Sequence, residues 1–232
     1  MKKNTIAITG GAGFVGSNLI TLLLKKTKFK IISIDNYSSG SIKNHIKDKR
    51  VKYLKADTKD IVKLLNKPKT LNSIFHFGEF ARIYQSFINM NDCINSNTIG
   101  SNAVFNFCLK HKIKLIYSAT SATLGNKGND KNLSPYAFTK AKNLELLENL
   151  KKWFNFKFEV IYFYNVYGPN QICKGNMATV IGIFENCFKT NKPITIVKPG
   201  TQSRRFTHIF DTVNICYLAW KNNKCRHYSI SN

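Results

Sequence analysis

The sequence predicts an α/β protein built on a doubly wound parallel sheet. Short β-branched or aromatic segments alternate with longer amphipathic ones, a glycine-rich turn joins the first of each, and hydroxyl side chains gather where a later strand is expected to end. With 232 residues, 43% of them hydrophobic, the chain can bury one substantial core.

The apolar segments set the expected order of elements. Helical periodicity follows the first strand from about residue 15 and returns over residues 136–153. Beyond Gly168 the alternation becomes irregular, so we expect a main domain over residues 1–168 and a smaller lobe over 169–232, with interleaved elements. Strands are expected at residues 5–9, 30–35, 51–55, 73–77, 114–120 and 159–164.

Charge and composition bear on partners and location. The net charge of +24 is dispersed along the chain instead of forming a phosphate-tracking stripe, so nucleic-acid binding is kept only as an alternative. No apolar run approaches the roughly 20 residues that cross a bilayer, and the N-terminus lacks signal-peptide features. We therefore expect a cytoplasmic protein without a membrane partner. Six cysteines without a C-x-x-C pair predict buried free thiols and no metal site.

The strongest local motif is a glycine loop between the first strand and the first helix. Gly10 permits a tight turn, Gly13 lets the backbone approach a pyrophosphate, and Gly16 allows close packing of helix on strand. Phe14 and Val15 open the helix, whose N–H groups face the phosphates. This arrangement predicts a Rossmann-type dinucleotide-binding domain.

Two carboxylates follow at the ends of the next strands. Asp35 lies about twenty residues beyond Gly16, where it can accept hydrogen bonds from ribose hydroxyls and repel a 2′-phosphate. The cofactor predicted is therefore NAD and not NADP. Asp57 either contacts the adenine or is a plain carboxylate at a strand end.

A Tyr-x-x-x-Lys pair supplies the candidate chemistry. Tyr136 and Lys140 lie one helical turn apart, after Pro135. The ammonium and a nearby nicotinamide cation both favour the phenolate, which lowers the tyrosine pKa and makes it a general base. The hydroxyl-rich strand end at residues 118–125 can hold a substrate oxygen beside that base.

Together these motifs resemble the extended short-chain dehydrogenase/reductases of the NAD-dependent epimerase/dehydratase family, with UDP-glucose 4-epimerase and heptose epimerases as the nearest resemblance. The resemblance covers essentially the whole chain. It rests on residues 9–16, 35–40, 75–78, 97, 136–140 and 162–169.

The resemblance implies roles for individual residues. Tyr136 is the expected base, Lys140 anchors the nicotinamide ribose, and Thr120, five residues before Gly125, is the hydroxyl partner, with Ser121 as the fallback. Further cofactor contacts are expected from Asn36, Phe77, Gly78 and Asn97, and substrate contacts from Asn165, Asn176, Met177 and Arg204. Arg204 either pairs with a nucleotide phosphate or is an ordinary surface arginine.

Two positions depart from the family pattern. Glu79 and Phe80 stand where relatives have small residues beside the cofactor, and Arg82 is expected to neutralise Glu79. His76 is expected to be structural.

The function expected is 4-epimerisation of a UDP-hexose through a transient 4-keto sugar. Ser121 and Ala122 stand where dehydratases of the family usually carry acids, which favours epimerisation. Alternatives are a 4-ketoreductase, a dehydratase or a truncated NAD-binding protein without turnover, because relatives continue well beyond residues 227–231. The resemblance also implies a homodimer formed through residues 92–111 and 136–153.

Overall fold

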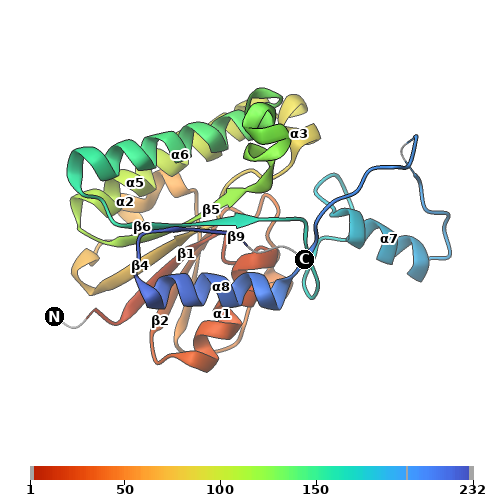
Figure 1. Cartoon of the computed structure of the whole chain (residues 1–232). Coiled ribbons are helices and arrows are strands. Elements are labelled where there is room, and N and C mark those ends of the chain that lie inside the picture. The colour runs from red at the N-terminus through yellow and green to blue at the C-terminus, as the bar shows by residue number, and fades with distance from the viewer. Residues whose placement is uncertain (1–2, 197, 230–232) are drawn as a thin grey trace.

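The computed structural model describes residues 3–196 and 198–229, and it confirms the expected fold class (Figure 1). In this part of the chain, parallel strands form a seven-stranded sheet in the order β3-β2-β1-β4-β5-β6-β9. Its strands are β1 (Thr5–Thr9), β2 (Lys30–Asp35), β3 (Val51–Lys55), β4 (Leu71–His76), β5 (Lys114–Thr120), β6 (Phe158–Phe163) and β9 (His227–Ser229).

Helices cover both faces of the sheet, as Figure 1 shows. One face carries α1 (Phe14–Lys26) and α8 (Ile209–Asn222), which pack against each other. The other carries α2 (Ile61–Leu64), α5 (Ser101–Lys110) and α6 (Pro135–Phe154). Apolar side chains must therefore point to both faces of each central strand, which is why these strands read as near-continuous apolar runs.

The core accordingly has two halves, one on each face. On β1, Ile6 and Ile8 pack with Leu19 of α1, whereas Ala7 packs toward the opposite helices. All five residues of β1 are buried. The predicted strand therefore forms because its side chains satisfy both layers.

Apart from η3 (Pro68–Thr70), which precedes β4 at the opposite edge, the remaining elements lie near the carboxyl edge of the sheet. Figure 1 shows α7 projecting from the main body, while α8 and β9 return to it. The chain after residue 168 thus contributes both to the projecting lobe and to the main sheet. These elements are α3 (Ile83–Ile88), α4 (Met90–Ile94), the π-helical turn η4 (Asn95–Gly100), the short helices η1 (Ile42–Asn44), η2 (Thr58–Asp60), η3 (Pro68–Thr70), η5 (Ser121–Thr123) and η6 (Gly125–Asn132), α7 (Val180–Lys189), and the paired strands β7 (Val166–Tyr167) and β8 (Thr207–His208).

The strand order reverses between β1 and β4, and this reversal positions the site. Helices that follow β1 and β4 leave the sheet on opposite faces, so a crevice opens at the carboxyl ends of these two strands. The glycine loop follows β1, and the segment containing Glu79 follows β4.

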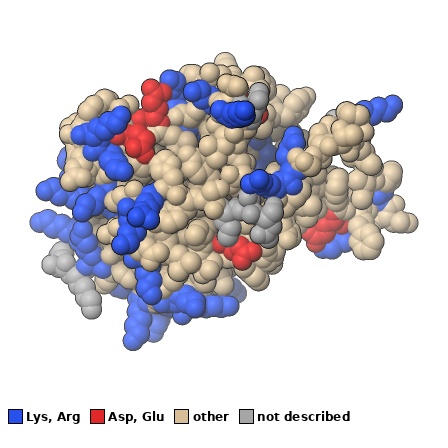
Figure 2. All heavy atoms as spheres, in the orientation of Figure 1, with Lys and Arg blue, Asp and Glu red and all other residues tan. Residues whose placement is uncertain are grey.

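The surface shows dispersed positive charge. On the face drawn in Figure 2, Lys and Arg side chains form several separate groups over the body. Among the described residues, no helix is long and apolar enough to cross a membrane. All six cysteines are free, as predicted, although only Cys93, Cys108 and Cys216 are fully buried.

A buried ion pair fixes the last strand to the sheet. Glu159 of β6 accepts hydrogen bonds from the backbone N–H groups of Cys225 and Arg226, at 3.0 and 2.9 Å. Its side chain is 0% exposed and pairs with Lys114 at 2.9 Å. Because Lys114 also donates to the carbonyls that end α8, this pair joins α8, β5, β6 and the entry to β9.

We predict that Glu159→Ala lowers the free energy of unfolding by about 3 to 5 kcal/mol, because it leaves a buried ammonium and two backbone N–H groups without their acceptor. Glu148→Ala is the matched control: its partner is His227, and both side chains are 41% exposed. That change should cost about 1 kcal/mol or less. Urea unfolding followed by circular dichroism measures both, and equal losses would contradict the assignment.

Candidate functional site

A large cleft, with a volume of about 960 Å³, lies at the carboxyl ends of the strands. Its wall brings together the glycine loop, the end of β2, the segment after β4, the end of β5 and the start of α6. These are the places where the sequence predicted function. The residues from the predicted set that line it are Gly10, Gly13, Phe14, Val15, Gly16, Asp35, Asn36, Asp57, Phe77, Gly78, Thr120, Tyr136, Lys140, Asn165, Met177 and Arg204.

The glycine loop has the geometry that its sequence predicts. Gly10 has a φ of +70°, and a Cβ there would lie 2.8 Å from the backbone carbon of Phe77. A Cβ on Gly16 would lie 2.2 Å from the carbonyl oxygen of Gly10. Gly13 is the helix N-cap and carries no capping side chain, so the first N–H groups of α1 face the cleft without a side-chain partner. This end of the cleft fits a pyrophosphate.

Asp35 is held at the adjoining end of the cleft by backbone donors. Its carboxylate accepts hydrogen bonds from the N–H groups of Ala12 and Tyr37, at 2.9 and 2.8 Å. Burial raises the pKa of Asp35, and these backbone hydrogen bonds oppose the rise. Each carboxylate oxygen keeps acceptor capacity for a ribose hydroxyl. This end of the cleft therefore fits the adenosine half of NAD. The basic residues that line the cleft, Arg82, Lys140 and Arg204, form their hydrogen bonds with other parts of the chain and not with Asp35.

Asp57 lies beside Asp35 but makes a different contact. Its Oδ1 accepts a hydrogen bond of 2.9 Å from the side-chain amide of Asn36. Both residues line the cleft, so either could reach an adenine or its ribose.

Tyr136 and Thr120 meet in the middle of the cleft. Tyr136 stands in the first turn of α6, after the Ser134 N-cap, whose hydroxyl accepts a hydrogen bond of 3.1 Å from the N–H of Ala137. Burial raises the pKa of Tyr136 to about 12, the hydrogen bond with the Thr120 hydroxyl lowers it, and the Glu79 carboxylate raises it. The phenol therefore holds its proton at neutral pH in this structure.

Lys140 lies one turn further along α6, where it contacts one acidic side chain and one backbone carbonyl. Its ammonium donates to Oε2 of Glu79 and to the backbone carbonyl of Ser118. The Lys140 and Glu79 side chains are only 4% and 2% exposed. The expectation that Arg82 neutralises Glu79 is wrong, because Arg82 turns away and donates to the Met177 carbonyl at 2.6 and 3.0 Å.

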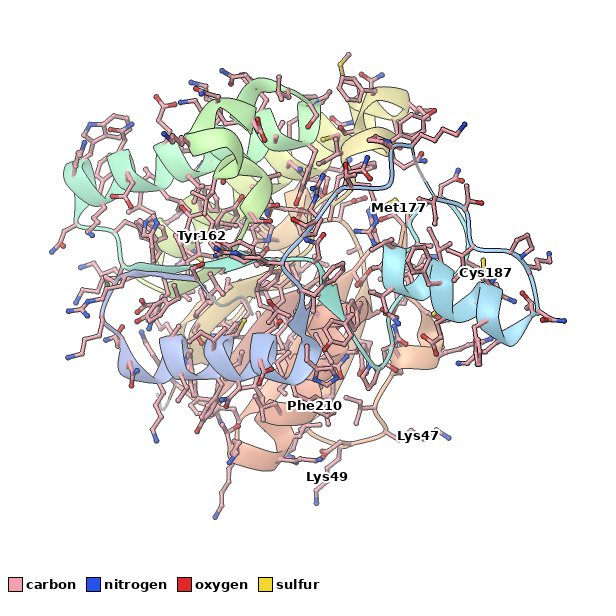
Figure 3. All side chains as sticks on the ribbon, turned by 45° about the vertical axis from the view of Figure 1, so that its right-hand side comes forward. Lys47, Lys49, Tyr162, Met177, Cys187 and Phe210 are labelled. Atoms are coloured by element: carbon pink, nitrogen blue, oxygen red, sulfur yellow. The ribbon has the colours of Figure 1, made fainter. Side chains whose placement is uncertain are left out.

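Part of the cleft wall comes from the smaller lobe. Met177, labelled in Figure 3, lies on the segment that enters α7. Asn165 donates to the backbone carbonyl of Arg205 at 2.9 Å, which ties the turn after β6 to the Arg204 segment. Arg204 itself is exposed and lines the cleft.

Two predicted residues in the described part of the chain lie off the cleft wall. Asn97 is fully buried, and its amide bonds the backbone of Phe80 and the Thr139 hydroxyl. It therefore positions the segment after β4 against α6. Asn176 is exposed and does not line the cleft, although its neighbour Met177 does.

Sequence reasoning missed three contributions to the site. Asp130 lines the cleft from η6, a segment whose polar composition carries no catalytic signal. Arg82 lines it and ties it to the lobe. Glu79 was noticed as a departure from the family pattern, but its partner could not be deduced, because Lys140 is 61 residues away in sequence.

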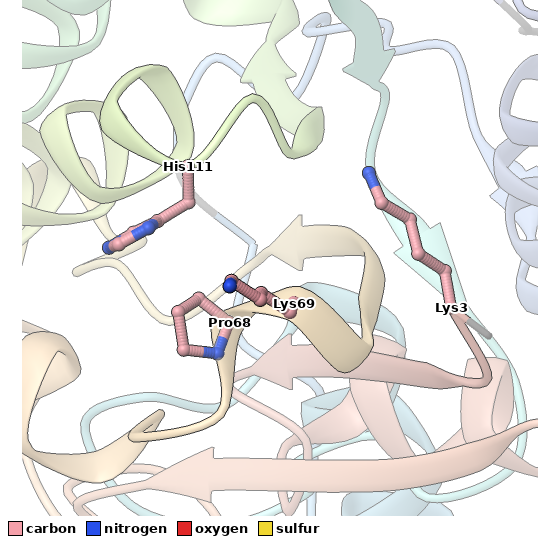
Figure 4. Close-up of a pocket in the computed structure, with 4 residues that line it drawn as sticks. All are labelled: Lys3, Pro68, Lys69 and His111. Carbon is pink, nitrogen blue, oxygen red and sulfur yellow. The ribbon is translucent and has the colours of Figure 1, made fainter. Parts of the chain in front are cut away.

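A second hollow, of about 530 Å³, opens at the opposite edge of the sheet. Figure 4 shows its lining residues Lys3, Pro68, Lys69 and His111, which precede β1, β4 and β5. Ligands of open α/β sheets bind at the carboxyl ends of the strands. The large cleft is therefore the candidate site.

Comparisons with known proteins agree with this geometry. The chain is 30% identical over 230 residues to the uncharacterized UDP-glucose epimerase YtcB of Bacillus subtilis, covering 90% of this chain and 70% of that one. The structure of this chain resembles that of UDP-N-acetylglucosamine 4-epimerase from Methanobrevibacter ruminantium in complex with UDP-N-acetylmuramic acid. The TM-score is 0.89 and the identity 26%, with coverage of 100% of this chain and 77% of that one.

A third similarity points the same way. UDP-glucose 4-epimerase from Thermotoga maritima, solved with UDP-glucose, matches with a TM-score of 0.86 and 25% identity, over 98% of this chain and 77% of that one. The model of the NAD-dependent epimerase/dehydratase family matches residues 6–231. The chain therefore belongs to the NAD-dependent epimerase/dehydratase family, whose cofactor is NAD.

Proposed function

We propose that this protein is a nucleotide-sugar epimerase that inverts the C4 hydroxyl of a UDP-hexose through a transient 4-keto sugar. The observation that carries the proposal is the meeting of Thr120, Tyr136 and Lys140 in the cleft that also contains the glycine loop. NAD, when bound, supplies a reversible hydride acceptor. The relatives named as UDP-glucose epimerases support this choice of substrate class.

The side chains divide the proton chemistry. Tyr136 removes the proton from the sugar 4-hydroxyl as the base and returns it to the ketone oxygen as the acid. Thr120 shares that proton through its hydroxyl, since it already bonds the phenol. Lys140, one helical turn from Tyr136 on α6, anchors the nicotinamide ribose in this proposal.

Inversion requires the ketone to turn over while the nucleotide stays bound. Arg204 and Asn165 line the lobe side of the cleft, where they can hold the diphosphate. A guanidinium suits this role because it pairs with phosphate oxygens through two parallel hydrogen bonds. The sugar is then free to present either face to the same hydride acceptor.

Dehydration is the second candidate, and Asp130 is the observation that favours it. Asp35 and Asp57 lie at the adenosine end, and Glu79 is paired with Lys140. Asp130 is thus the acidic residue among the described lining residues that remains for the sugar end. A 4,6-dehydratase needs such an extra acid, which the Ser121-Ala122 pair does not provide.

Incubation of the purified chain with NAD and a panel of UDP- and dTDP-hexoses, followed by NMR, tests the proposal. Interconversion of C4 epimers without net change in NAD supports epimerisation. A 4-keto-6-deoxy product would establish dehydration, and consumption of NADH with a 4-keto sugar would establish reduction. Absence of any product with every sugar would overturn the proposal.

We also propose a homodimer formed through the helices beside the cleft. Large apolar side chains are exposed there on α4, η4 and α6, including Met90, Ile99 and Trp153 at 53%, 51% and 63%. Pairing of these helices would remove that apolar surface from water. Sedimentation equilibrium measures the state directly.

We predict that Asp35→Ala weakens NAD binding about 10- to 100-fold, the effect of removing hydrogen bonds to a charged group. The preference for NAD over NADP should also decrease, because the variant lacks the carboxylate that repels a 2′-phosphate. Asp57→Ala is the matched control and should change the preference less. Calorimetric titration of both cofactors measures this, and wild-type binding of NADP as tightly as NAD would contradict it.

We predict that Tyr136→Phe lowers kcat by about a hundredfold to ten-thousandfold, the usual contribution of general acid/base catalysis. Cofactor affinity should stay close to wild type, since one hydroxyl is lost without a change in charge. Thr120→Ala should cost less, because water can replace a hydrogen-bonding hydroxyl. Tyr84→Phe, at a side chain that is 72% exposed, is the control. Full activity of Tyr136→Phe would exclude this tyrosine as the base.

A further inference from the structure

Glu79 lies beneath the catalytic cleft with every donor around it aimed at its carboxylate. Oε1 accepts hydrogen bonds from Ser101 at 2.7 Å, from Tyr117 at 3.0 Å and from Asn143 at 3.0 Å. Oε2 accepts the ammonium of Lys140. Four hydrogen-bond donors, one of them an ammonium, therefore converge on the carboxyl group of Glu79.

A hydrogen-bond chain extends this arrangement back to the first strand. Ser101 donates to Glu79, so it must accept from Nε2 of His76, 2.9 Å away. Nδ1 of His76 then accepts from the Thr9 hydroxyl at 2.7 Å. Burial lowers the pKa of His76 to about 4, which keeps the ring neutral and consistent with this assignment.

The chain ends on the strand that carries the glycine loop. The Thr9 oxygen accepts the backbone N–H groups of Phe77 and Gly78, at 3.2 and 3.0 Å. The segment from Phe77 to Glu79 is therefore fixed at both ends. The position of the Glu79 carboxylate is set by β1, β4, β5 and two helices together.

The ammonium of Lys140 uses two of its three hydrogen-bond donors within the protein. An ammonium has three N–H donors, and Lys140 gives one to Glu79 and one to the Ser118 carbonyl. Its Nζ also lies 4.6 Å from the centre of the Tyr117 ring. The third N–H is used in neither of these two hydrogen bonds, and Lys140 and Glu79 both line the cleft.

We propose that Glu79 is a positioning residue that fixes Lys140 and whose negative charge cancels the bias of the Lys140 ammonium against the oxidised, cationic form of the cofactor. The proposal deepens the proposed function, because an epimerase must begin each cycle with oxidised cofactor. A lysine alone would repel the nicotinamide cation, and the paired carboxylate cancels that repulsion.

The ratio of dissociation constants for NAD+ and NADH tests the proposal without turnover. Glu79→Gln should raise this ratio about tenfold, the effect of one unit charge about 12 Å away at an effective dielectric constant of about 20. Calorimetric titration of each cofactor form gives the ratio. A ratio within about twofold of wild type, for a folded variant, overturns the proposal.

Two controls separate charge from structure. Glu145→Gln makes the same chemical change on α6 at a side chain that is 61% exposed, and it should leave the ratio unchanged. Tyr117→Phe removes one hydrogen bond from Oε1 but keeps the carboxylate charge, so the ratio should again be unchanged. A shift in either control as large as that of Glu79→Gln would mean that the effect is not due to this charge.

A second variant covers failure of Glu79→Gln to fold. Glu79→Gln combined with Lys140→Met leaves no buried charge unpaired and is expected to fold. Both affinities should fall, but their ratio should match wild type because the two removed charges cancel. A shift toward NAD+ would show that only the lysine charge had counted and would overturn the proposal.

Failure of the proposed function has a different signature. A wild-type protein that converts no sugar, together with a shifted ratio in Glu79→Gln, would reject the epimerase and keep the role of Glu79. Normal epimerisation by the wild type, together with an unchanged ratio in Glu79→Gln, would keep the epimerase and reject the role of Glu79.

Discussion

The buried ammonium of Lys140 joins three elements of this structure at the wall of the cleft. Its partners come from the segment after β4, through Glu79, and from the end of β5, through the Ser118 carbonyl. The lysine itself stands on α6, one turn from Tyr136. Because the ammonium needs all these acceptors once it leaves water, the three elements must meet at one point, and that point lies where the strand order opens the sheet.

Features encoded by local pattern could be predicted from the sequence. The glycine loop needs a positive φ at Gly10 and close packing at Gly16, and both requirements appear within eight residues. Buried parallel strands read as apolar runs, so the six expected strands coincide with β1 to β6 to within two residues at either end. Asp35 follows from its place at a strand end.

Features that depend on distant partners could not be predicted. Arg82 is three residues from Glu79 and seemed its natural partner, yet it reaches 95 residues along the chain to the Met177 carbonyl. Asn97 carries the family signal, but its amide is used by Phe80 and Thr139. In both cases, the choice of partner depends on how loops pack at the carboxyl edge, which no local periodicity encodes.

The Glu79–Lys140 pair is difficult to explain by stability alone. Burying two charges costs several kcal/mol for each ion, and an apolar pair of similar volume is often no less stable. The surrounding donors reduce that cost but do not require a lysine. What the pair provides is a lysine on the cleft wall whose charge is balanced by a buried carboxylate. A cofactor that alternates between a cationic and a neutral ring is sensitive to that balance. The position of the carboxylate is therefore better explained by the chemistry above it than by the core below.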